Sequence, residues 1–494
     1  MMNKYLILLL LVATLQPIQA QNFGDSSHPM NKDTDNGLIL NYWTKKSDLT
    51  NAVYESALSI LSAKPEASFS DLAANTTFQK LAQQDGMKLL AGPMLGNIKE
   101  NGVSIWVRTL KPAMVSVEVI GQDYSHKFGP VRSSSATDLS AVLVVNGLKP
   151  SSTYTYRLFI DGKAIPATAE MHFHTSASSS NLTDATRIVF GSCPHRWGLG
   201  NPTLLSEIQS HKPDAFLLYG DIAVQDRTNN LGMHRADYLL RDFHPAWKSL
   251  TSSIPVYATW DDHDYFGNDL SGVPKGFVAK DRENVREVFK NSWNNPSYGF
   301  EESKQGIFTR TRIGAFDIIM TDNRFYRDDQ IFLGRTQLDW LKKELLACTA
   351  PFIILSCGTM WSDYVSNGKD SWGENDAEGR EEIFNFIEKN NISGVLLLSG
   401  DRHGARGFRI PRKSGFNYYE FEPGSLGGRV GPPAKQDTWD TQLFGLDGTF
   451  AFGELTYVPS TTDPGVEFRL VKEDGSLLYE LKLMRSQLTP NNFH

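Results

Sequence analysis

The sequence predicts an α/β protein in which a layered core follows a β-sandwich and a helical N-terminal extension. Residues 186–485 contain short apolar runs that alternate with amphipathic helical patterns, as in layered α/β domains. Residues 89–178 instead alternate apolar and polar side chains between Gly, Pro and Asn turns, as in a sandwich. Residues 21–88 show apolar residues at three- and four-residue spacing, which indicates helices.

Length and composition limit the classes of protein that the chain can represent. At 494 residues it is too long for one ordinary domain, and 40% hydrophobic with 21% charged residues is typical of a soluble globular protein. The net charge of −7 gives no basic footprint, so nucleic-acid binding is not expected as the main role. We expect no transmembrane segment and a monomer. Only three cysteines are present, which excludes a disulfide scaffold, and Cys348 and Cys357 are expected to be free.

Residues 1–20 have the pattern of a cleavable signal peptide. Lys4 supplies the positive charge, YLILLLLVATL is apolar but too short to span a bilayer, and Ile18-Gln19-Ala20 offers small residues before a cut at Gln21. The alternative is a buried first helix. Export is the interpretation that we adopt, and it places the mature protein in the periplasm or outside the cell.

Two helices are expected in the extension, residues 21–88. In LTNAVYESALSILSA the apolar residues Val53, Ala57, Ile60 and Leu61 recur with helical spacing. The second helix covers LAANTTFQKLAQQDG and ends at Gly86. We expect no chemistry in this extension.

The next segment, residues 89–178, is expected to be a fibronectin- or immunoglobulin-like sandwich with a structural role. Its strands are VSIWVRT, MVSVEVIG, DLSAVLVVNGL and STYTYRLFID. The small polar residues SASSSNLTD at 176–184 then form a linker to the core, whose last strands are expected within 416–485.

Four apolar runs in the core end in residues that can bind metal ions. They are RIVFGSCPH at 187–195, DAFLLYGD at 214–221, PVYATWDDHD at 255–264 and GVLLLSGDRH at 394–403. Open α/β sheets hold their ligands at the carboxyl ends of the strands. Carboxylates are tolerated at buried strand ends where a cation or a proton transfer requires them. The runs therefore predict one metal site at the carboxyl edge of a sheet.

Three of these runs provide carboxylates, and two of the three also carry an imidazole. Asp221 follows a strand and a glycine, where a carboxylate can bridge two cations, although a simple helix cap is the alternative. Asp401 and His403 are two residues apart and can enter one site from an extended backbone.

The WDDHD run combines a metal ligand with an acid–base residue. Asp262 is expected to bind the metal, and His263 can protonate a leaving oxygen near neutral pH. Asp264 is expected to orient His263, with a turn cap as the alternative. Asn268 can add an amide oxygen to a hard cation.

Cys193 and His195 form a C-x-H pair at a strand end. Cys193 is interpreted as a thiolate ligand of the metal, with a small buried residue as the alternative. His195 is a second candidate ligand, for which neither interpretation is favoured. Arginines near the motifs can hold an anionic oxygen bidentately, although each alone is more typical of a surface ion pair. These arginines are Arg227, Arg324, Arg402 and Arg406.

The motifs GSC, LLYGD, ATWDDHDYFGND, TDNR and LLLSGDRH occur in an order that resembles the PhoD-type alkaline phosphatases and phosphodiesterases, a branch of the calcineurin-like metallophosphoesterases. The resemblance covers about four fifths of the chain and implies a four-layer αββα core that hydrolyses phosphate mono- and diesters with a metal-bound hydroxide. It also implies iron and calcium at the site. By resemblance Cys193 is an iron ligand, Asp221 the bridge and His263 the acid. Three further ligands are implied, namely Asp262, Asp401 and His403.

One position departs from the family pattern. The family has an iron-binding Tyr three residues after the GD aspartate, and this chain has Val224. His195 or Asp226 can replace it, and our hypothesis is that His195 does so. An imidazole in place of a phenolate weakens the case for ferric iron and leaves zinc, manganese or ferrous iron open.

The sequence thus predicts an exported, metal-dependent phosphoester hydrolase with a small phosphoester substrate. Attack by water is assisted by two or more metal ions, His263 protonates the leaving alkoxide, and Arg324 and Arg402 stabilise the phosphoryl charge. One alternative is a phosphodiesterase or phospholipase D-like enzyme acting on phospholipid or polymer diesters. Residues 265–305 are the segment expected to close the pocket and set this preference. Another alternative is an extracellular binding protein that has lost turnover.

Overall fold

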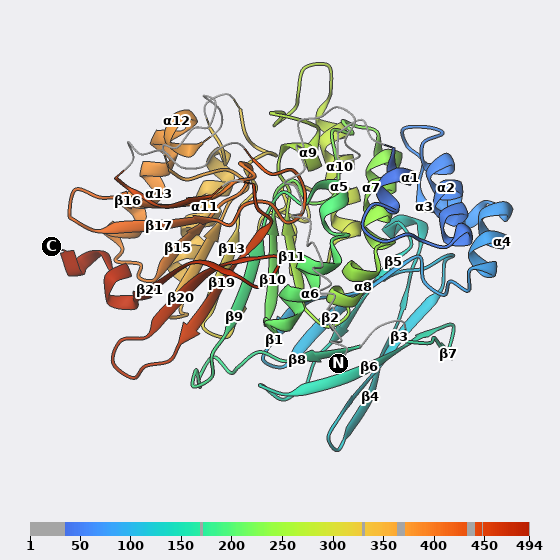
Figure 1. Ribbon diagram of the computed structural model, residues 1–494, viewed down its shortest axis with the longest axis horizontal. Coiled ribbons are helices and arrows are strands. Elements are labelled where there is room, and N and C mark those ends of the chain that lie inside the picture. Colours follow the sequence, from blue (N-terminus) through green and yellow to red (C-terminus); the bar gives the residue numbers. More distant parts are fainter. Residues whose placement is uncertain are drawn as a thin grey trace, which may run out of the picture.

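A computed structural model describes residues 35–167, 171–328, 331–362, 371–431, 440–446 and 448–493. The expected signal peptide, residues 1–20, lies outside the described residues. Figure 1 shows two strand-rich layers side by side with helices outside them, and the N-terminal helices and sandwich strands gathered at the right. The expected mixed α/β class, with several sheets, is confirmed.

The described part of the N-terminal extension, from residue 35 onward, forms four helices. They are α1 (Asn36–Leu40), α2 (Asp48–Leu61), α3 (Phe69–Ala74) and α4 (Thr76–Gln84). The expected single helix over LAANTTFQKLAQQDG is wrong, because Asn75 has an extended backbone and its side chain accepts a hydrogen bond from the Phe78 N–H at 2.9 Å. Asparagine favours this capping geometry, so α3 ends and α4 begins there.

Residues 91–174 form two antiparallel sheets whose buried side chains share one core. The first contains β1 (Ala91–Lys99), β2 (Gly102–Arg108) and β5 (Ser140–Val145). The second contains β3 (Met114–Gly121), β4 (Tyr124–Arg132), β6 (Thr153–Ile160), β7 (Lys163–Ala164) and β8 (His172–His174). Strand β4 was not expected from the sequence, because it pairs only with β3 and most of its side chains are exposed and polar.

The first sheet of the core has six strands in the order β11-β10-β9-β19-β20-β21. Its parallel strands are β9 (Arg187–Gly191), β10 (Ala215–Tyr219) and β11 (Val256–Thr259). Its antiparallel strands are β19 (Ala451–Val458), β20 (Gly465–Lys472) and β21 (Leu477–Met484). Leu218 pairs with both Gly191 and Ala258, so the three parallel strands end at the same level.

The second core sheet has seven strands in the order β12-β13-β14-β15-β17-β16-β18. Strands β13 (Phe316–Met320), β14 (Phe352–Ser356), β15 (Val395–Leu398) and β17 (Asn417–Glu422) run parallel. The remaining strands are β12 (Thr309–Ile313), β16 (Ala405–Pro411) and β18 (Gln442–Leu446).

Apolar side chains join these sheets to each other and to the helices. Inner-face residues of both sheets belong to one buried cluster, in which the rings of Phe421 and Phe468 stack with centroids 4.0 Å apart. A second cluster joins the other face of the six-stranded sheet to α6 (Pro202–Ser210), α7 (Leu231–Asp242), α8 (Pro245–Thr251) and α10 (Ala279–Ser292). A third joins the seven-stranded sheet to α11 (Gly334–Ala347), α12 (Trp372–Asn375) and α13 (Ala377–Lys389). Two short helices, α5 (His195–Gly198) and α9 (Asp262–Tyr265), follow strands β9 and β11. Short 3-10 turns lie at Ser135–Thr137, Arg485–Leu488 and Pro490–Phe493.

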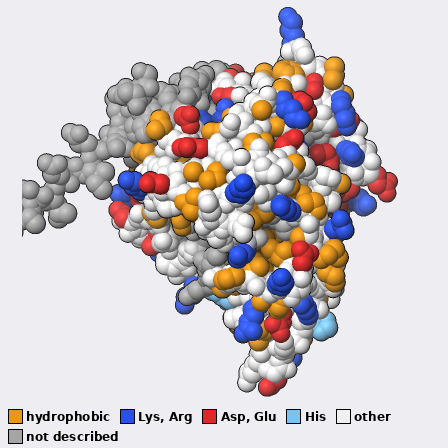
Figure 2. All heavy atoms as spheres, turned by 90° about the vertical axis from the view of Figure 1, so that its right-hand side faces the viewer, with side chains coloured by type: hydrophobic (Ala, Val, Ile, Leu, Met, Phe, Trp, Pro, Cys, Tyr) orange, Lys and Arg blue, Asp and Glu red, His pale blue; other side chains and the backbone are white. Residues whose placement is uncertain are grey.

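The sandwich is attached to the core through polar contacts of β1. The Ile98 N–H donates to the Tyr257 hydroxyl at 2.8 Å, and Asn294 Nδ2 donates to the carbonyls of Met94 and Ser104 at 2.9 and 3.0 Å. Figure 2 shows basic side chains interspersed with acidic and apolar ones on the face that carries the N-terminal helices, so the described residues there form no continuous basic surface. Within the described ranges, no helix has the length and apolar character needed to cross a membrane.

Candidate metal centre

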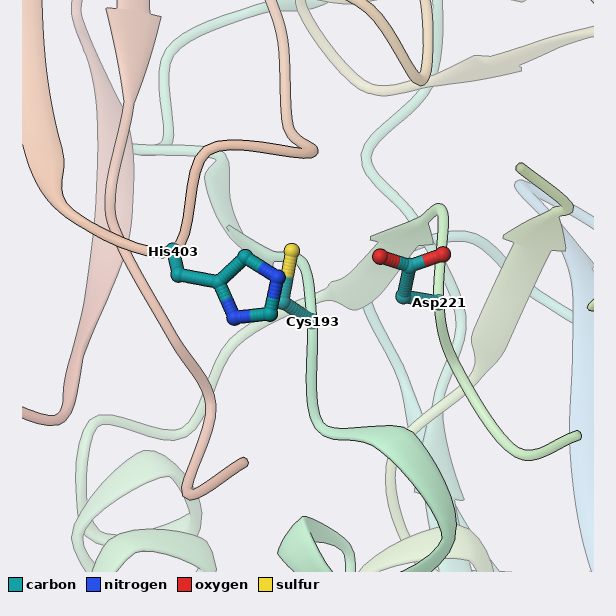
Figure 3. Close-up of side chains that lie close together, drawn as sticks. All are labelled: Cys193, Asp221 and His403. Carbon is teal, nitrogen blue, oxygen red and sulfur yellow. The ribbon is translucent and has the colours of Figure 1, made fainter. Parts of the chain in front are cut away.

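The ends of four parallel strands bring the predicted ligands together. Residues after β9 supply Cys193, those after β10 supply Asp221, those after β11 supply Asp262, and those after β15 supply Asp401 and His403. Figure 3 shows the His403 ring directed toward the Cys193 thiol, with the Asp221 carboxylate beside them. The site thus lies where three strands of the six-stranded sheet and one strand of the seven-stranded sheet end.

Left-handed backbone conformations direct these side chains inward. The φ angle is 54° at Cys193, 53° at Asp221, 80° at Asp401 and 61° at His403. This conformation costs a residue with a side chain roughly 1–2 kcal/mol, and such residues cluster at functional sites where the surroundings enforce them. Gly220, at φ 80°, allows the close approach of Asp261, whose Cβ would lie 2.8 Å from a side chain at that position.

The potential ligand atoms form three groups in which all atoms lie within 4.8 Å of one another. The groups are Cys193–Asp221–His403, Asp221–Asp262–His263 and Asp261–Asp262–Asp401. Asp221 belongs to the first two, which is the position expected of a carboxylate between two cations. The third group consists only of carboxylates, the ligands that hard cations prefer.

The hydrogen bonding of Asp221 fits a metal ligand. Both of its carboxylate oxygens are buried and, among the described residues, have no hydrogen-bond partner. Buried polar atoms are nearly always paired, so two unpaired carboxylate oxygens indicate that the site is built for a cation. Burial raises the pKa of Asp221 well above its usual range, and the charges of Asp262, Asp261 and Asp401 add to the rise while His263 opposes it.

His195 lies beside Asp221 and is completely enclosed. Its Nε2 is 4.0 Å from Asp221 Oδ2, and its ring stacks on that of His403 with centroids 5.0 Å apart. Neither ring nitrogen has a hydrogen-bond partner among the described residues. Burial, with a further contribution from His403 and His263, lowers the pKa of His195 well below its usual value, which keeps the ring neutral and able to bind a metal.

Cys193 and His403 require different accounts of their ligand character. Burial and the nearby Asp221 raise the pKa of the Cys193 thiol well above its usual value, so only a bound cation would hold it as a thiolate. Burial lowers the pKa of His403 to about 4. His403 Nδ1 lies 2.9 Å from the Arg429 carbonyl oxygen, a contact in which Nδ1 carries the proton and Nε2 keeps its lone pair.

The partner of His263 is Asp226, and the expectation that Asp264 orients this histidine is wrong. His263 Nδ1 lies 2.7 Å from Asp226 Oδ1. Burial lowers the pKa of His263, but the carboxylates of Asp221, Asp262 and Asp226 more than compensate and place it well above the usual value. These carboxylates therefore favour the protonated form of the ring.

Asp264 instead holds the backbone that carries Asp221. Its carboxylate accepts hydrogen bonds from the N–H groups of Ile222, Ala223 and Val224 at 2.8, 2.9 and 3.1 Å. Burial raises the pKa of Asp264 to about 6, although these bonds oppose the rise. The short α9 helix (Asp262–Tyr265) turns Asp264 away from His263, and this turn was not predictable from the spacing of the residues.

The four arginines near the motifs each pair with a carboxylate of the chain. Arg324 is fully buried, its Nε bonds Asp261, and its Nη2 lies 3.9 Å from Asp262 Oδ1. Arg402 Nε lies 3.3 Å from Asp401 Oδ2. The remaining two pairs are Arg406–Glu422 and Arg227–Asp237.

Comparison with known proteins gives the family of this chain. The model of the PhoD-like phosphatase family matches residues 188–443, which include all of the predicted ligands. The chain belongs to the PhoD-like phosphatase family. The resemblance read from the sequence is thereby confirmed. Residues 86–178 match a separate domain of unknown function, DUF7800.

The two family members compared with this chain have low sequence identity to it. Alkaline phosphatase D from Bacillus subtilis (strain 168) is 24% identical over 321 residues, or 53% of this chain and 52% of the relative. The match therefore spans about half the length of that protein. A solved structure of PhoD has a TM-score of 0.66 at 18% identity and covers 81% of this chain and 91% of its own.

A plant enzyme has a similar fold. The purple acid phosphatase PPD1 from seeds of yellow lupin (Lupinus luteus) has a TM-score of 0.61 at 15% identity, with coverage of 81% of this chain and 75% of its own. At such identities the two solved structures show the fold alone.

The departure from the PhoD-like pattern at Val224 has a structural counterpart. Val224 is buried in the apolar cluster outside the six-stranded sheet, and only its backbone N–H makes a described polar contact, to Asp264. Of the two candidates for the missing ligand, His195 lies beside Asp221, whereas Asp226 is bonded to His263. Ligation by His195 stays a prediction.

Two parts of the site were missed or placed differently. Asn268 is exposed, its Nδ2 donates to Asp269 Oδ2 at 2.7 Å, and ligation through its amide stays a prediction. Glu422 was not singled out, yet it is fully buried and accepts from the Arg402 N–H at 2.7 Å, between the two ligands of the DRH motif. A single glutamate at the end of the strand NYYEFE gives no signal of this role.

Proposed function

We propose that the protein is an exported, metal-dependent phosphoester hydrolase. The observation that carries the proposal is Asp221, whose buried and unpaired carboxylate is shared by two groups of ligand atoms next to the Asp226–His263 pair. This combination supports the proposal that cation binding and proton transfer occur within one site.

The ligand atoms support two metal environments. Cys193 offers sulfur, His195 and His403 offer nitrogen, and Asp221 adds a carboxylate oxygen, a set that suits iron, zinc or manganese. Asp261, Asp262 and Asp401 offer only oxygen, which suits calcium, and Asn268 could contribute an amide oxygen. Asp221 also groups with Asp262, so it is proposed to be shared between the two environments. When bound, such a pair of cations lowers the pKa of a water molecule and neutralises charge on the phosphoryl oxygens.

His263 is the proposed acid for the leaving group. Asp226 occupies its Nδ1, so Nε2 is the nitrogen that would deliver a proton to the departing alkoxide. The neighbouring carboxylates, which raise the pKa of His263, favour retention of that proton. Asp226 orients the ring in the manner that a carboxylate orients the histidine of a catalytic triad.

Two arginines have different proposed roles. Arg402 is only partly buried beside Asp401, and its guanidinium is proposed to stabilise charge on the substrate. Arg324 has no exposed surface, so it is proposed to hold Asp261 and Asp262 in place and to act on charge from behind them.

The organisation of the chain follows the same proposal. Residues 1–20 are a signal peptide for export to the periplasm or beyond, 21–88 a helical extension, 89–178 a fibronectin- or immunoglobulin-like sandwich, and 186–485 a four-layer αββα catalytic domain. The contacts of the two core sheets with each other and with their helices support this layering. A monomer acting on a small phosphoester is the proposed working form.

The proposal is tested with matched chromogenic phosphate monoester and diester substrates. We expect turnover of at least one class by the wild-type protein and its loss in Asp221→Ala, and the faster substrate assigns a phosphatase or a phosphodiesterase. A metal-loaded protein that hydrolyses neither class would overturn the proposed function and favour a binding protein.

A further inference from the structure

A buried polar network connects the N-terminal helices to the segment that orients His263. At its centre is Asp237 of α7, whose side chain has no exposed surface. Asn36, the first residue of α1, donates from Nδ2 to Asp237 Oδ1 at 2.8 Å and accepts at Oδ1 from Arg196 Nη1 at 2.6 Å. Figure 1 shows α1 beside α7, and α1 also contacts α5 (His195–Gly198).

Asp237 binds both neighbours of Asp226. The Gln225 N–H donates to Asp237 Oδ2 at 3.3 Å, and Arg227 donates from Nε and Nη2 to the two carboxylate oxygens at 2.7 and 3.0 Å. Asp226 therefore lies between two residues that are fixed to the same carboxylate. Its own carboxylate extends to the opposite side, where Oδ1 contacts His263 Nδ1.

The conformation of Asp226 requires such support. Its φ angle is 54°, a left-handed conformation that a non-glycine residue keeps only where the surroundings enforce it. The network provides this support through the buried carboxylate of Asp237, which must itself be paired with a charged or polar partner. Arg227 pairs with it as an ion pair, and Asn36 donates a hydrogen bond to it.

We propose that Asn36 and Asp237 are positioning residues for His263. Together they fix residues 225–227 so that Asp226 keeps its hydrogen bond to the histidine ring, and the N-terminal extension becomes part of the catalytic unit. The inference rests on the proposed function only in taking His263 as the acid. No pattern in the sequence links Asn36 to Asp237, which lies 201 positions later.

If the network merely stabilised the fold, disrupting it would affect catalysis in a different way. Loss of stability lowers the amount of active protein and reduces turnover of every substrate by the same factor. Loss of the oriented acid acts selectively, because protonation matters most when the leaving group is a poor one. The phenyl and p-nitrophenyl esters of the substrate class that the enzyme prefers separate these outcomes, since phenol is the poorer leaving group.

The first experiment measures kcat and KM for both esters in Asn36→Leu and Asp237→Asn. We expect kcat for the phenyl ester to fall about tenfold more than for the p-nitrophenyl ester, with little change in KM, because misplacement of a catalytic group by about 1 Å costs up to about 10²-fold. His263→Ala defines the full selective loss.

Arg235→Met is the matched control. Arg235 also lies in α7 and bonds Asp138 and the Ala67 carbonyl, at 2.7 and 2.9 Å, but it makes no described contact with residues 225–227. We expect this variant to affect both esters equally. Circular dichroism at the assay temperature verifies that each variant is folded. If Asp237→Asn does not fold, Asn36→Leu alone tests the proposal.

A second readout does not depend on turnover. Hydrogen–deuterium exchange is measured for a peptide covering residues 222–228, in which the Gln225 and Asp226 N–H groups bond Asp237 and the His263 carbonyl. We expect faster exchange in Asn36→Leu than in the wild-type protein or Arg235→Met. Equal exchange, or equal loss for the two esters, would overturn the positioning role. A wild-type protein without activity but with the expected exchange pattern would overturn the acid role of His263 and the proposed function. The stabilisation of residues 225–227 by the network would still stand.

Discussion

Asp221 and His195 show how a site residue can be recognised from the partners that it does not have. Four of their nitrogen and oxygen atoms are buried with no hydrogen-bond partner among the described residues. An unpaired buried polar group costs about 1–3 kcal/mol, so a cluster of such atoms indicates a place for a ligand. His244 also has two buried ring nitrogens without a partner among the described residues, so the feature that distinguishes His195 is the combination of unpaired nitrogens with a position beside Asp221.

We predict that His195→Ala lowers the number of metal ions bound per chain. The imidazole lies beside Asp221 at the position where it can replace the tyrosine missing at Val224. Loss of a ligand typically weakens binding strongly, and metal analysis of the dialysed protein measures it. His211→Ala is the control, because His211 bonds Glu454 and Glu207 outside the site. An unchanged metal content in His195→Ala would rule out ligation by this residue.

The roles of Asp226 and Asp264 mark the limit of residue-level prediction. Asp264 is adjacent to His263 in the sequence, whereas Asp226 lies 37 positions before it, and adjacency favoured Asp264. A short helix directs Asp264 to three backbone N–H groups, while the left-handed Asp226 returns to the histidine. Neither conformation has a pattern in the surrounding residue types, so the exchange of roles could only be seen in three dimensions.

Elements were predictable where the hydrophobic pattern was strong. The four strands that carry the ligands are short apolar runs, and each is completely or almost completely buried. Strand β4 was missed because an edge strand with exposed polar side chains lacks that pattern. The boundary between α3 and α4 was missed because a single asparagine within a helical pattern determines it.

We predict that Asn75→Ala destabilises the N-terminal extension without changing the catalytic rate. The Asn75 side chain caps α4 through the Phe78 N–H, and loss of such a cap costs about 1 kcal/mol. Asn75→Asp keeps an oxygen acceptor and is expected to retain wild-type stability. Urea unfolding of the three proteins tests this, and equal midpoints for Ala and Asp would contradict the capping role.

At the scale of the whole molecule, buried histidines make stability depend on pH. His244 immediately precedes α8 and is buried, and neither of its ring nitrogens has a hydrogen-bond partner among the described residues. Burial lowers its pKa to about 3. Below the usual pKa of about 6.5 this histidine binds a proton in the unfolded chain but stays neutral in the folded protein. The free energy of unfolding therefore falls as the pH drops from about 6.5 toward 3.

We predict that His244→Leu reduces this acid sensitivity. The histidine should contribute a loss of about 1.4 kcal/mol per pH unit below about pH 6.5, and the leucine removes it. Urea unfolding at pH 7 and pH 5 measures the difference, with His126→Leu at an exposed position of β4 as the control. The idea fails if the decline between the two pH values is the same in His244→Leu and wild type.

The overall organisation was largely accessible from the sequence, whereas the connection between its parts was not. Alternating patterns and strand-end ligands predicted an α/β core with a metal site at its edge. The N-terminal extension was expected to have no chemistry, yet Asn36 bonds a carboxylate behind the Asp226–His263 pair. Contacts between residues 201 positions apart depend on the packing of whole elements, which periodicity within one element does not determine.

The most direct test of the account counts the metal ions bound to the wild-type protein and to Asp221→Ala. Because Asp221 is proposed to lie between two cations, replacing it with alanine should reduce the bound metal at both positions and abolish hydrolysis in the same preparation. We expect two or more ions per chain in the wild-type protein and a loss of at least one in the variant, which should remain folded by circular dichroism. Full metal content together with wild-type activity in Asp221→Ala would contradict the shared-carboxylate centre.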